Sequence, residues 1–264
     1  MLIFFLLALP GRAMALSIHE WAHAYAANKC GDPTARMLGR MTLNPAAHLD
    51  LIGTIMMAFV GFGWAKPVPV NPRNYRNFRR DDIIVSLAGI TMNLALFLLS
   101  FILCVAIVMI ALSTLPFTAA EQLGSEMAMT SYGGMKIFFD GEYILPMDFI
   151  IKNAPFLGDY IITPIWGRLA GYIFTMLRYF VEVNICLAIF NLIPVPPLDG
   201  SHVITSLFPR SPFRDPRFRR GAYMVLILFL FSSYGGRLLG FLCNGAISGV
   251  GAALHALLNI LGIA

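Results

Sequence analysis

The sequence predicts an all-α polytopic membrane protein. Of its 264 residues, 58% are hydrophobic and only 12% are charged, whereas soluble domains carry about 25% charged residues. Apolar stretches of about 20 residues, the length that a membrane-spanning helix needs, recur along the chain. We therefore expect about 4–6 membrane helices, with a small membrane-associated β or re-entrant element after the first helix.

The expected core spans are residues 2–28, 83–113 and 163–191. Further apolar sequence follows over about 221–263, and it is interrupted by a short polar and glycine-containing stretch. This part fits either two helices or one span plus a surface helix, and the sequence does not decide between them. We expect all of these elements to form one integral-membrane domain, residues 1–264.

The connection between the first two spans is the expected place of the non-helical element. It contains several glycines and prolines, which interrupt helices. Residues 51–63 are apolar but too few for a full crossing, so a re-entrant or interfacial segment fits them better. Residues 64–80 are rich in proline and arginine, and we expect them to be extended at the headgroup surface.

The first span carries the motif HEWAH, residues 19–23. On a helix, His19 and His23 lie one turn apart on the same face, which suits two ligands of one tetrahedral zinc ion. Glu20 between them is placed to act as a general base on an activated water molecule. So short a motif also occurs by chance, but ionisable groups in an apolar helix are costly and indicate a functional site.

Charge placement predicts the orientation of the chain. Two arginine groups, in residues 73–80 and 210–220, belong on the cytoplasmic side, and the acidic residues 116–162 then lie outside. The motif is thereby placed toward the cytoplasmic end of the first span of a multi-pass membrane protein. The excess of arginine in the cytoplasmic loops accounts for the net charge of +5, so we do not expect nucleic-acid binding. The four scattered cysteines favour neither disulfides nor a thiolate zinc site.

Two histidines leave a catalytic zinc site one protein ligand short. Asp199, in NLIPVPPLDG, follows the third span at about the depth expected for His23. By itself, Asp-Gly is a common turn signal. Beside a two-histidine site that lacks a ligand, we favour Asp199 as the third ligand.

Together these stretches resemble the site-2 protease family of intramembrane zinc metalloproteases, peptidase family M50, in its compact bacterial form without PDZ or CBS domains. The resemblance covers roughly residues 15–100 and 180–205 and includes GDPTARMLGRMTLNPAAHLDLIGT, GWAKPVPVNPRNYR and SLAGITMNL. Two prolines common in relatives are replaced here, by Ile90 and by Leu51.

The resemblance implies roles for five residues. His19, His23 and Asp199 would hold one Zn²⁺ per chain, and Glu20 would be the general base. Asn191, eight residues before Asp199, would donate a hydrogen bond to the oxyanion or to the substrate backbone.

The implied function is hydrolysis of peptide bonds in or near transmembrane segments, for regulated intramembrane proteolysis or for clearance of membrane peptides. The expected partners are a transmembrane-segment substrate and the lipid bilayer. The sequence does not decide whether the protein forms a homo-oligomer, because the glycine spacing near the C-terminus fits helix packing within one chain or between two. The alternative is a membrane metal-ion transporter or metal-binding protein. We favour the protease over the transporter because the expected metal ligands lie at one depth in the membrane and a glutamate lies where a general base is needed.

Overall fold

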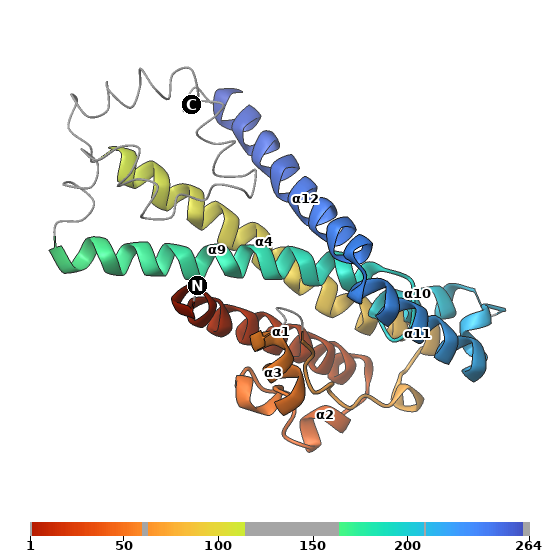
Figure 1. Cartoon of the computed structure of the whole chain (residues 1–264). Coiled ribbons are helices and arrows are strands. Elements are labelled where there is room, and N and C mark those ends of the chain that lie inside the picture. Colours follow the sequence, from red (N-terminus) through yellow and green to blue (C-terminus); the bar gives the residue numbers. More distant parts are fainter. Residues whose placement is uncertain (1, 60–62, 114–163, 209, 261–264) are drawn as a thin grey trace. The chain divides into compact units, whose positions relative to one another are not determined.

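The computed structural model describes residues 2–59, 63–113, 164–208 and 210–260, and regular structure in this part is helical (Figure 1). The expectation of an all-α fold is confirmed for these residues. The principal helices are α1 (Leu2–Cys30), α2 (Thr34–Met37), α3 (Leu51–Phe59), α4 (Phe78–Ser113), α9 (Pro164–Leu192), α10 (Asp199–Leu207), α11 (Pro216–Phe231) and α12 (Ser233–Ile260). Short 3₁₀ turns occur at Pro45–Ala47, Pro72–Asn74 and Pro212–Arg214.

The helices match the expected core spans closely, with one helix starting earlier than predicted. Helix α4 begins at Phe78 because Asn77 caps it: its Oδ1 accepts from the Arg80 N–H at 3.2 Å. The Asp81 carboxylate in turn accepts from the Asn77 N–H at 2.8 Å, so the two side chains satisfy donors reciprocally. The apolar C-terminal part is two helices, α11 and α12, divided at Ser232.

The expected β element is not confirmed, because no strand is found among the described residues. An isolated antiparallel bridge joins Leu49 to Ala65, and the Lys66 N–H donates to the His48 carbonyl at 2.6 Å. Pro67 and other nearby prolines lack the N–H that a longer ladder would need. The acidic segment 116–162 lies outside the described residues.

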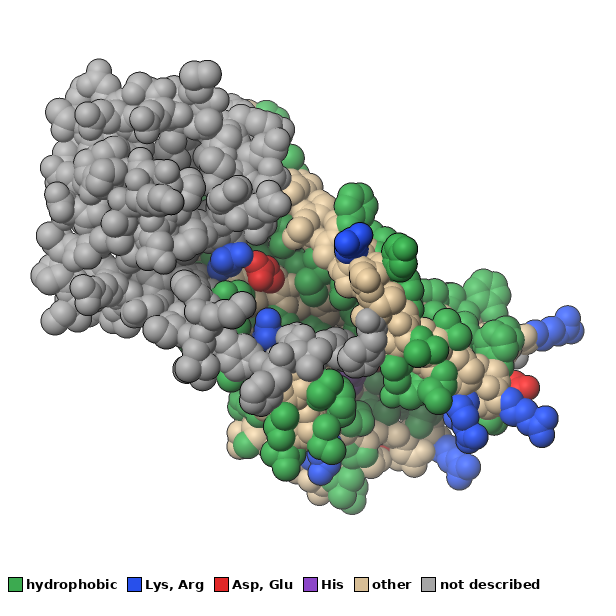
Figure 2. Space-filling model, in the orientation of Figure 1, with side chains coloured by type: hydrophobic (Ala, Val, Ile, Leu, Met, Phe, Trp, Pro, Cys, Tyr) green, Lys and Arg blue, Asp and Glu red, His purple; other side chains and the backbone are tan. Residues whose placement is uncertain are grey.

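Among the described residues, two helices are long and apolar enough to cross a membrane, over Phe78–Ala106 in α4 and Ser233–Leu254 in α12. Helix α4 is apolar on all sides: Phe97 is fully buried, whereas Leu99 on another face is 66% exposed. Such a helix is typical of a membrane span. Figure 2 shows hydrophobic side chains over much of the surface drawn, with basic side chains gathered near the start of α11. The number of spans stays a prediction.

By its internal packing the chain divides into two units, Met1–Ser100 with Tyr179–Leu239, and Phe101–Arg178 with Gly240–Ala264. The first unit holds α1, α2, α3, α10, α11, the N-terminal part of α4 and the C-terminal part of α9. Every residue predicted for the site belongs to this unit. The expected single-domain organisation stays a prediction.

The buried carboxylate of Asp32 fixes the proline-rich segment to the end of α1. It accepts hydrogen bonds from the Asn71 N–H at 2.6 Å and the Asn74 side chain at 2.8 Å, and from the N–H and hydroxyl of Thr34. Burial opposes the charged form, but these donors outweigh it and hold the pKa of Asp32 below its usual value. Asp32 therefore joins α1, α2 and residues 71–74.

Replacing Asp32 with asparagine should lower the stability of the fold, because one acceptor oxygen becomes an NH₂ group facing other donors. We expect a loss of about 1–3 kcal/mol in the free energy of unfolding at pH 7, the usual penalty for buried polar groups left unpaired. Unfolding of the detergent-solubilised protein measures it. Asp215→Asn is the control, because Asp215 caps exposed helix α11 and asparagine caps equally well.

Wild type and Asp32→Asn should also differ in how the free energy of unfolding depends on pH. A lowered folded-state pKa stabilises the fold above the ordinary value of 3.8, and this contribution is lost as the pH falls through the folded-state pKa. The stability gap between wild type and Asp32→Asn should therefore shrink below about pH 4. A gap of unchanged size at pH 3 would contradict a role for the Asp32 charge.

Candidate metal centre

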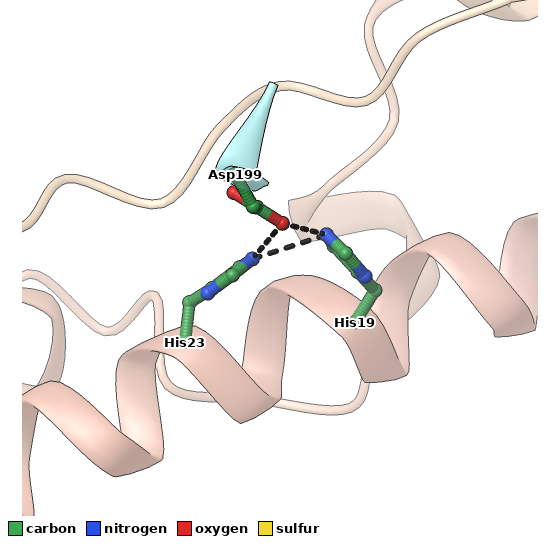
Figure 3. A group of neighbouring side chains, drawn as sticks. All are labelled: His19, His23 and Asp199. Atoms are coloured by element: carbon green, nitrogen blue, oxygen red, sulfur yellow. Dashed lines mark hydrogen bonds and ion pairs between the residues drawn. The ribbon is translucent and has the colours of Figure 1, made fainter. Parts of the chain in front are cut away.

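Two histidines of α1 lie with their rings together. His19 and His23 are one helical turn apart, and their Nε2 atoms are 3.0 Å from each other. The rings are nearly perpendicular, at 85°. Both side chains are largely buried, with exposed fractions of 6% and 12%. The two nitrogens thus point at one small region of space (Figure 3).

Asp199, the first residue of α10, completes the group. Its Oδ2 atom lies 3.2 Å from Nε2 of His19 and 3.2 Å from Nε2 of His23. Gly200 makes this approach feasible, because a Cβ there would lie only 2.5 Å from the Leu192 carbonyl oxygen. The start of α10 can therefore pack directly on the end of α9.

The electrostatics of the group favour an ionised carboxylate. Burial disfavours the charge on Asp199, but without metal, and with an imidazole ring protonated, hydrogen bonds and charge interactions with His19 and His23 outweigh it and hold its pKa well below the usual range. The carboxylate therefore carries a negative charge toward the two imidazoles.

The group fits a zinc ion. Ligands about 2.0–2.1 Å from a tetrahedral Zn²⁺ lie about 3.3 Å apart, close to the spacing of these three atoms. His23 Nδ1 lies 2.7 Å from the Val85 carbonyl oxygen, which can only accept, so Nδ1 carries the hydrogen. In the neutral ring, Nε2 then presents its lone pair to the other two ligand atoms, the tautomer that binds metal.

Helix α4 packs against both histidine rings at Gly89. A Cβ on Gly89 would lie 2.5 Å from His19 Cε1 and 2.6 Å from His23 Nε2. These separations are shorter than any normal contact, so the residue must be a glycine for the rings to keep their positions. One turn earlier, Val85 provides the carbonyl that fixes His23.

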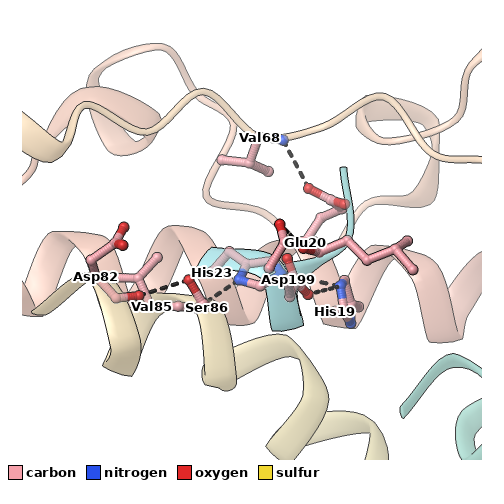
Figure 4. A network of polar contacts seen from close by, with 10 residues as sticks. His19, Glu20, His23, Val68, Asp82, Val85, Ser86 and Asp199 are labelled. Atoms are coloured by element: carbon pink, nitrogen blue, oxygen red, sulfur yellow. Dashed lines mark hydrogen bonds and ion pairs between the residues drawn. The ribbon is translucent and has the colours of Figure 1, made fainter. Parts of the chain in front are cut away.

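Helix α4 also holds α10. The buried Ser206 hydroxyl donates to the buried Asp82 carboxylate. Figure 4 shows Ser86 beside Asp82, whose carbonyl accepts from the Ser86 hydroxyl at 2.7 Å. Ser206 is seven residues after Asp199, on the same side of α10. Asp82 therefore contributes to fixing the helix that delivers the carboxylate to the histidines.

The structure places the other two predicted site residues differently. Glu20 lies between the histidines in sequence, and its Oε2 accepts from the Val68 N–H at 2.8 Å. Asn191 is half-buried, one residue before the end of α9. In the described part of the chain, no hydrogen bond or ion pair of the three-residue group involves Asn191. His48 and Asp50 contact the backbone instead: His48 Nε2 lies 2.7 Å from the Thr42 carbonyl oxygen, and Asp50 Oδ1 accepts from the Gly53 N–H at 2.8 Å.

Comparison with known proteins identifies the class. The family model described as peptidase family M50 matches residues 4–233, so this chain belongs to peptidase family M50. A Bacillus subtilis (strain 168) protein named as a candidate zinc metalloprotease, YwhC, is 34% identical over 196 residues, 74% of this chain and 66% of the relative. Rip2 of Mycolicibacterium smegmatis, also named as a candidate zinc metalloprotease, is 33% identical over 97 residues, 35% of this chain and 37% of the relative. The chain thus covers less than two thirds of either relative. No solved structure matches it.

Several residues of the site region carry no motif of their own. Val85 and Val68 act through backbone atoms, which no residue type reveals. Ser206 and Asp82 meet only after folding. Gly89 does have a signal, because an isolated glycine inside a long apolar helix often marks close packing. In the sequence, SLAGITMNL indicates the family but assigns no role to this glycine.

Replacing Gly89 with alanine should displace the histidine rings and weaken metal binding by about 10- to 100-fold, the range typical of changes to groups that orient metal ligands. Metal content after dialysis against a competing chelator measures the effect. Gly245→Ala is the control, because a Cβ there meets no atom within 4 Å. Equal metal retention by both variants would contradict the close approach of α4.

Proposed function

We propose that this protein is a membrane zinc metalloprotease that hydrolyses peptide bonds in or near transmembrane segments of its substrates. The observation that carries the proposal is the convergence of His19, His23 and Asp199, whose ligand atoms lie within 4.8 Å of one another, beside Glu20. Membership of peptidase family M50 and the names of two relatives support the same conclusion.

In this proposal His19, His23 and Asp199 hold one zinc ion per chain, through two neutral imidazoles and a carboxylate. When bound, zinc supplies Lewis acidity that activates water and polarises the scissile carbonyl. The Val85 carbonyl keeps His23 in the ligating tautomer. Gly89 leaves the space that the two rings need.

Glu20 takes the proton from the attacking water and later returns it to the leaving amine. Its position next to His19 on α1 keeps the carboxylate close to the ligand group. Asn191 is assigned to hydrogen-bond the developing oxyanion or the substrate backbone. Its place near the end of α9, just before the turn that leads to Asp199, supports this assignment.

The substrate is proposed to be a transmembrane segment that becomes extended before cleavage, because helical peptide bonds are not accessible to the site. The apolar helices α4 and α12 support a multi-pass protein of the cytoplasmic membrane, and the arginine groups support an active site toward the cytoplasm. The metal-transporter alternative requires ligand groups along a path across the bilayer. In the described ranges, a single group of this kind is found.

Glu20→Gln should retain zinc and lose proteolysis, because glutamine cannot accept the water proton. We expect turnover of a transmembrane-segment substrate in detergent or liposomes to fall by about 10²- to 10⁴-fold. Asp199→Asn is the contrasting variant, because it should lose both zinc and cleavage. Cleavage at the wild-type rate by Glu20→Gln would exclude the proposed mechanism.

Asn191→Ala should lower kcat by about 10²- to 10³-fold with zinc content unchanged, if its side chain stabilises the oxyanion. Single-turnover cleavage together with zinc analysis measures both quantities. Asn244→Ala, at an exposed position of α12, is the matched control. A raised KM with unchanged kcat would instead assign Asn191 to substrate binding alone.

A further inference from the structure

The general base proposed above is held by a backbone group from a distant segment. Glu20 Oε2 accepts a hydrogen bond from the Val68 N–H at 2.8 Å, and Figure 4 shows the Glu20 carboxylate directed toward that N–H. Val68 is 48 residues further along the chain, in the extended segment between α3 and α4. This contact connects the segment with the residue next to His19.

The sequence around Val68 makes this donor unusual. Val68 stands between Pro67 and Pro69, and neither proline has an N–H. Of the three residues 67–69, Val68 is therefore the only one that can donate a backbone hydrogen bond. That single donor is directed at Glu20.

The segment is fixed on both sides of Val68, so the N–H has a defined position. Before it, the Arg40 guanidinium donates to the carbonyls of Lys66 and Pro67, at 2.9 and 3.3 Å. After it, the Asn71 N–H donates to the buried Asp32 carboxylate at 2.6 Å. Arg40 and Asp32 thus hold the two ends of a stretch that is otherwise without regular structure.

The Val68 side chain adds a third attachment. It is buried against Ala24 and Ala35, with Met41 packed alongside. Ala24 is one turn after Glu20 on α1, so Val68 packs on the same side of the helix from which Glu20 extends. Backbone and side chain together place the N–H at the carboxylate.

We propose that Val68 is a positioning residue whose N–H fixes the rotamer of Glu20, and this inference rests on the proposed role of Glu20 as general base. A glutamate side chain has three rotatable bonds, and a fixed Oε2 removes most of that freedom. Oε1 is then the oxygen presented to the reacting water. The segment 65–71 thereby contributes to catalysis through Glu20.

Hydrogen exchange of the full-length protein in detergent tests the contact without any substrate. Val68 carries the one exchangeable backbone amide of residues 67–69, so NMR of protein labelled with ¹⁵N-valine follows its exchange as a single group. Exchange should be at least about tenfold faster in Glu20→Ala than in wild type. It should stay within about threefold of wild type in Glu20→Gln, because the amide oxygen still accepts the bond. Equal exchange in wild type and Glu20→Ala would overturn the proposal.

Val68→Pro tests the consequence for turnover, because it deletes the N–H while the neighbouring prolines already favour an extended backbone. We expect kcat to fall by about 10- to 100-fold, with KM and zinc content within about twofold of wild type. Val68→Ala keeps the N–H but loses part of the side-chain packing on Ala24 and Ala35, so kcat should fall less than in Val68→Pro. Val70→Pro, at an exposed position of the same segment, controls for an added proline.

The outcomes separate this inference from the proposed function. If wild type cleaves no transmembrane substrate, the proposed function fails. The exchange experiment still shows whether the Val68 N–H bonds to Glu20. If wild type cleaves and Val68→Pro has unchanged or increased kcat, the positioning role fails and the protease assignment stands. If Val68→Pro does not fold, the exchange comparison of Glu20→Ala with wild type alone decides.

Discussion

The metal centre depends on the close approach of α4 to α1 at Gly89. Both histidine rings lie where a Cβ on this residue would be, so the absence of a side chain sets their positions. The same helix supplies the Val85 carbonyl to His23 and the Asp82 carboxylate to Ser206 on α10. Helix α4 contributes no ligand atom, yet it contacts both elements that do.

The site depends on three kinds of contact. His19 and His23 come from one helix, so their spacing is local and tolerant of changes elsewhere. Asp199 comes from a different helix, and its approach requires the tight packing of Gly200 on the end of α9. A third contact, from Val68 to Glu20, comes from a segment without regular structure, which is held by buried Asp32. Each level of organisation supplies one part of the centre.

Features set by residues close together in the sequence could be predicted, whereas most contacts between residues far apart in the sequence could not. The helical pair of His19 and His23 is set by a spacing of four residues, and the apolar lengths of α1, α4 and α9 are local properties too. Asp199 could be predicted as a ligand because its expected depth after the third span matches that of His23. The partnership of Asp82 with Ser206 spans 124 residues and has no local pattern. The β element is not confirmed in the described residues, where Leu49 and Ala65 form an isolated bridge and the prolines that follow lack the N–H that a longer ladder needs.

The division of the centre between α1 and α10 also affects how the protein is made. A ribosome synthesises α1 and inserts it long before Asp199 exists, so the nascent chain carries two ligand groups without the third. Two neutral imidazoles alone bind zinc more weakly than the full set with its carboxylate. The protein therefore acquires its complete ligand set only when α10 packs onto α4. If the protein is the proposed membrane protease, an unfinished chain would therefore lack the site that cleaves peptide bonds.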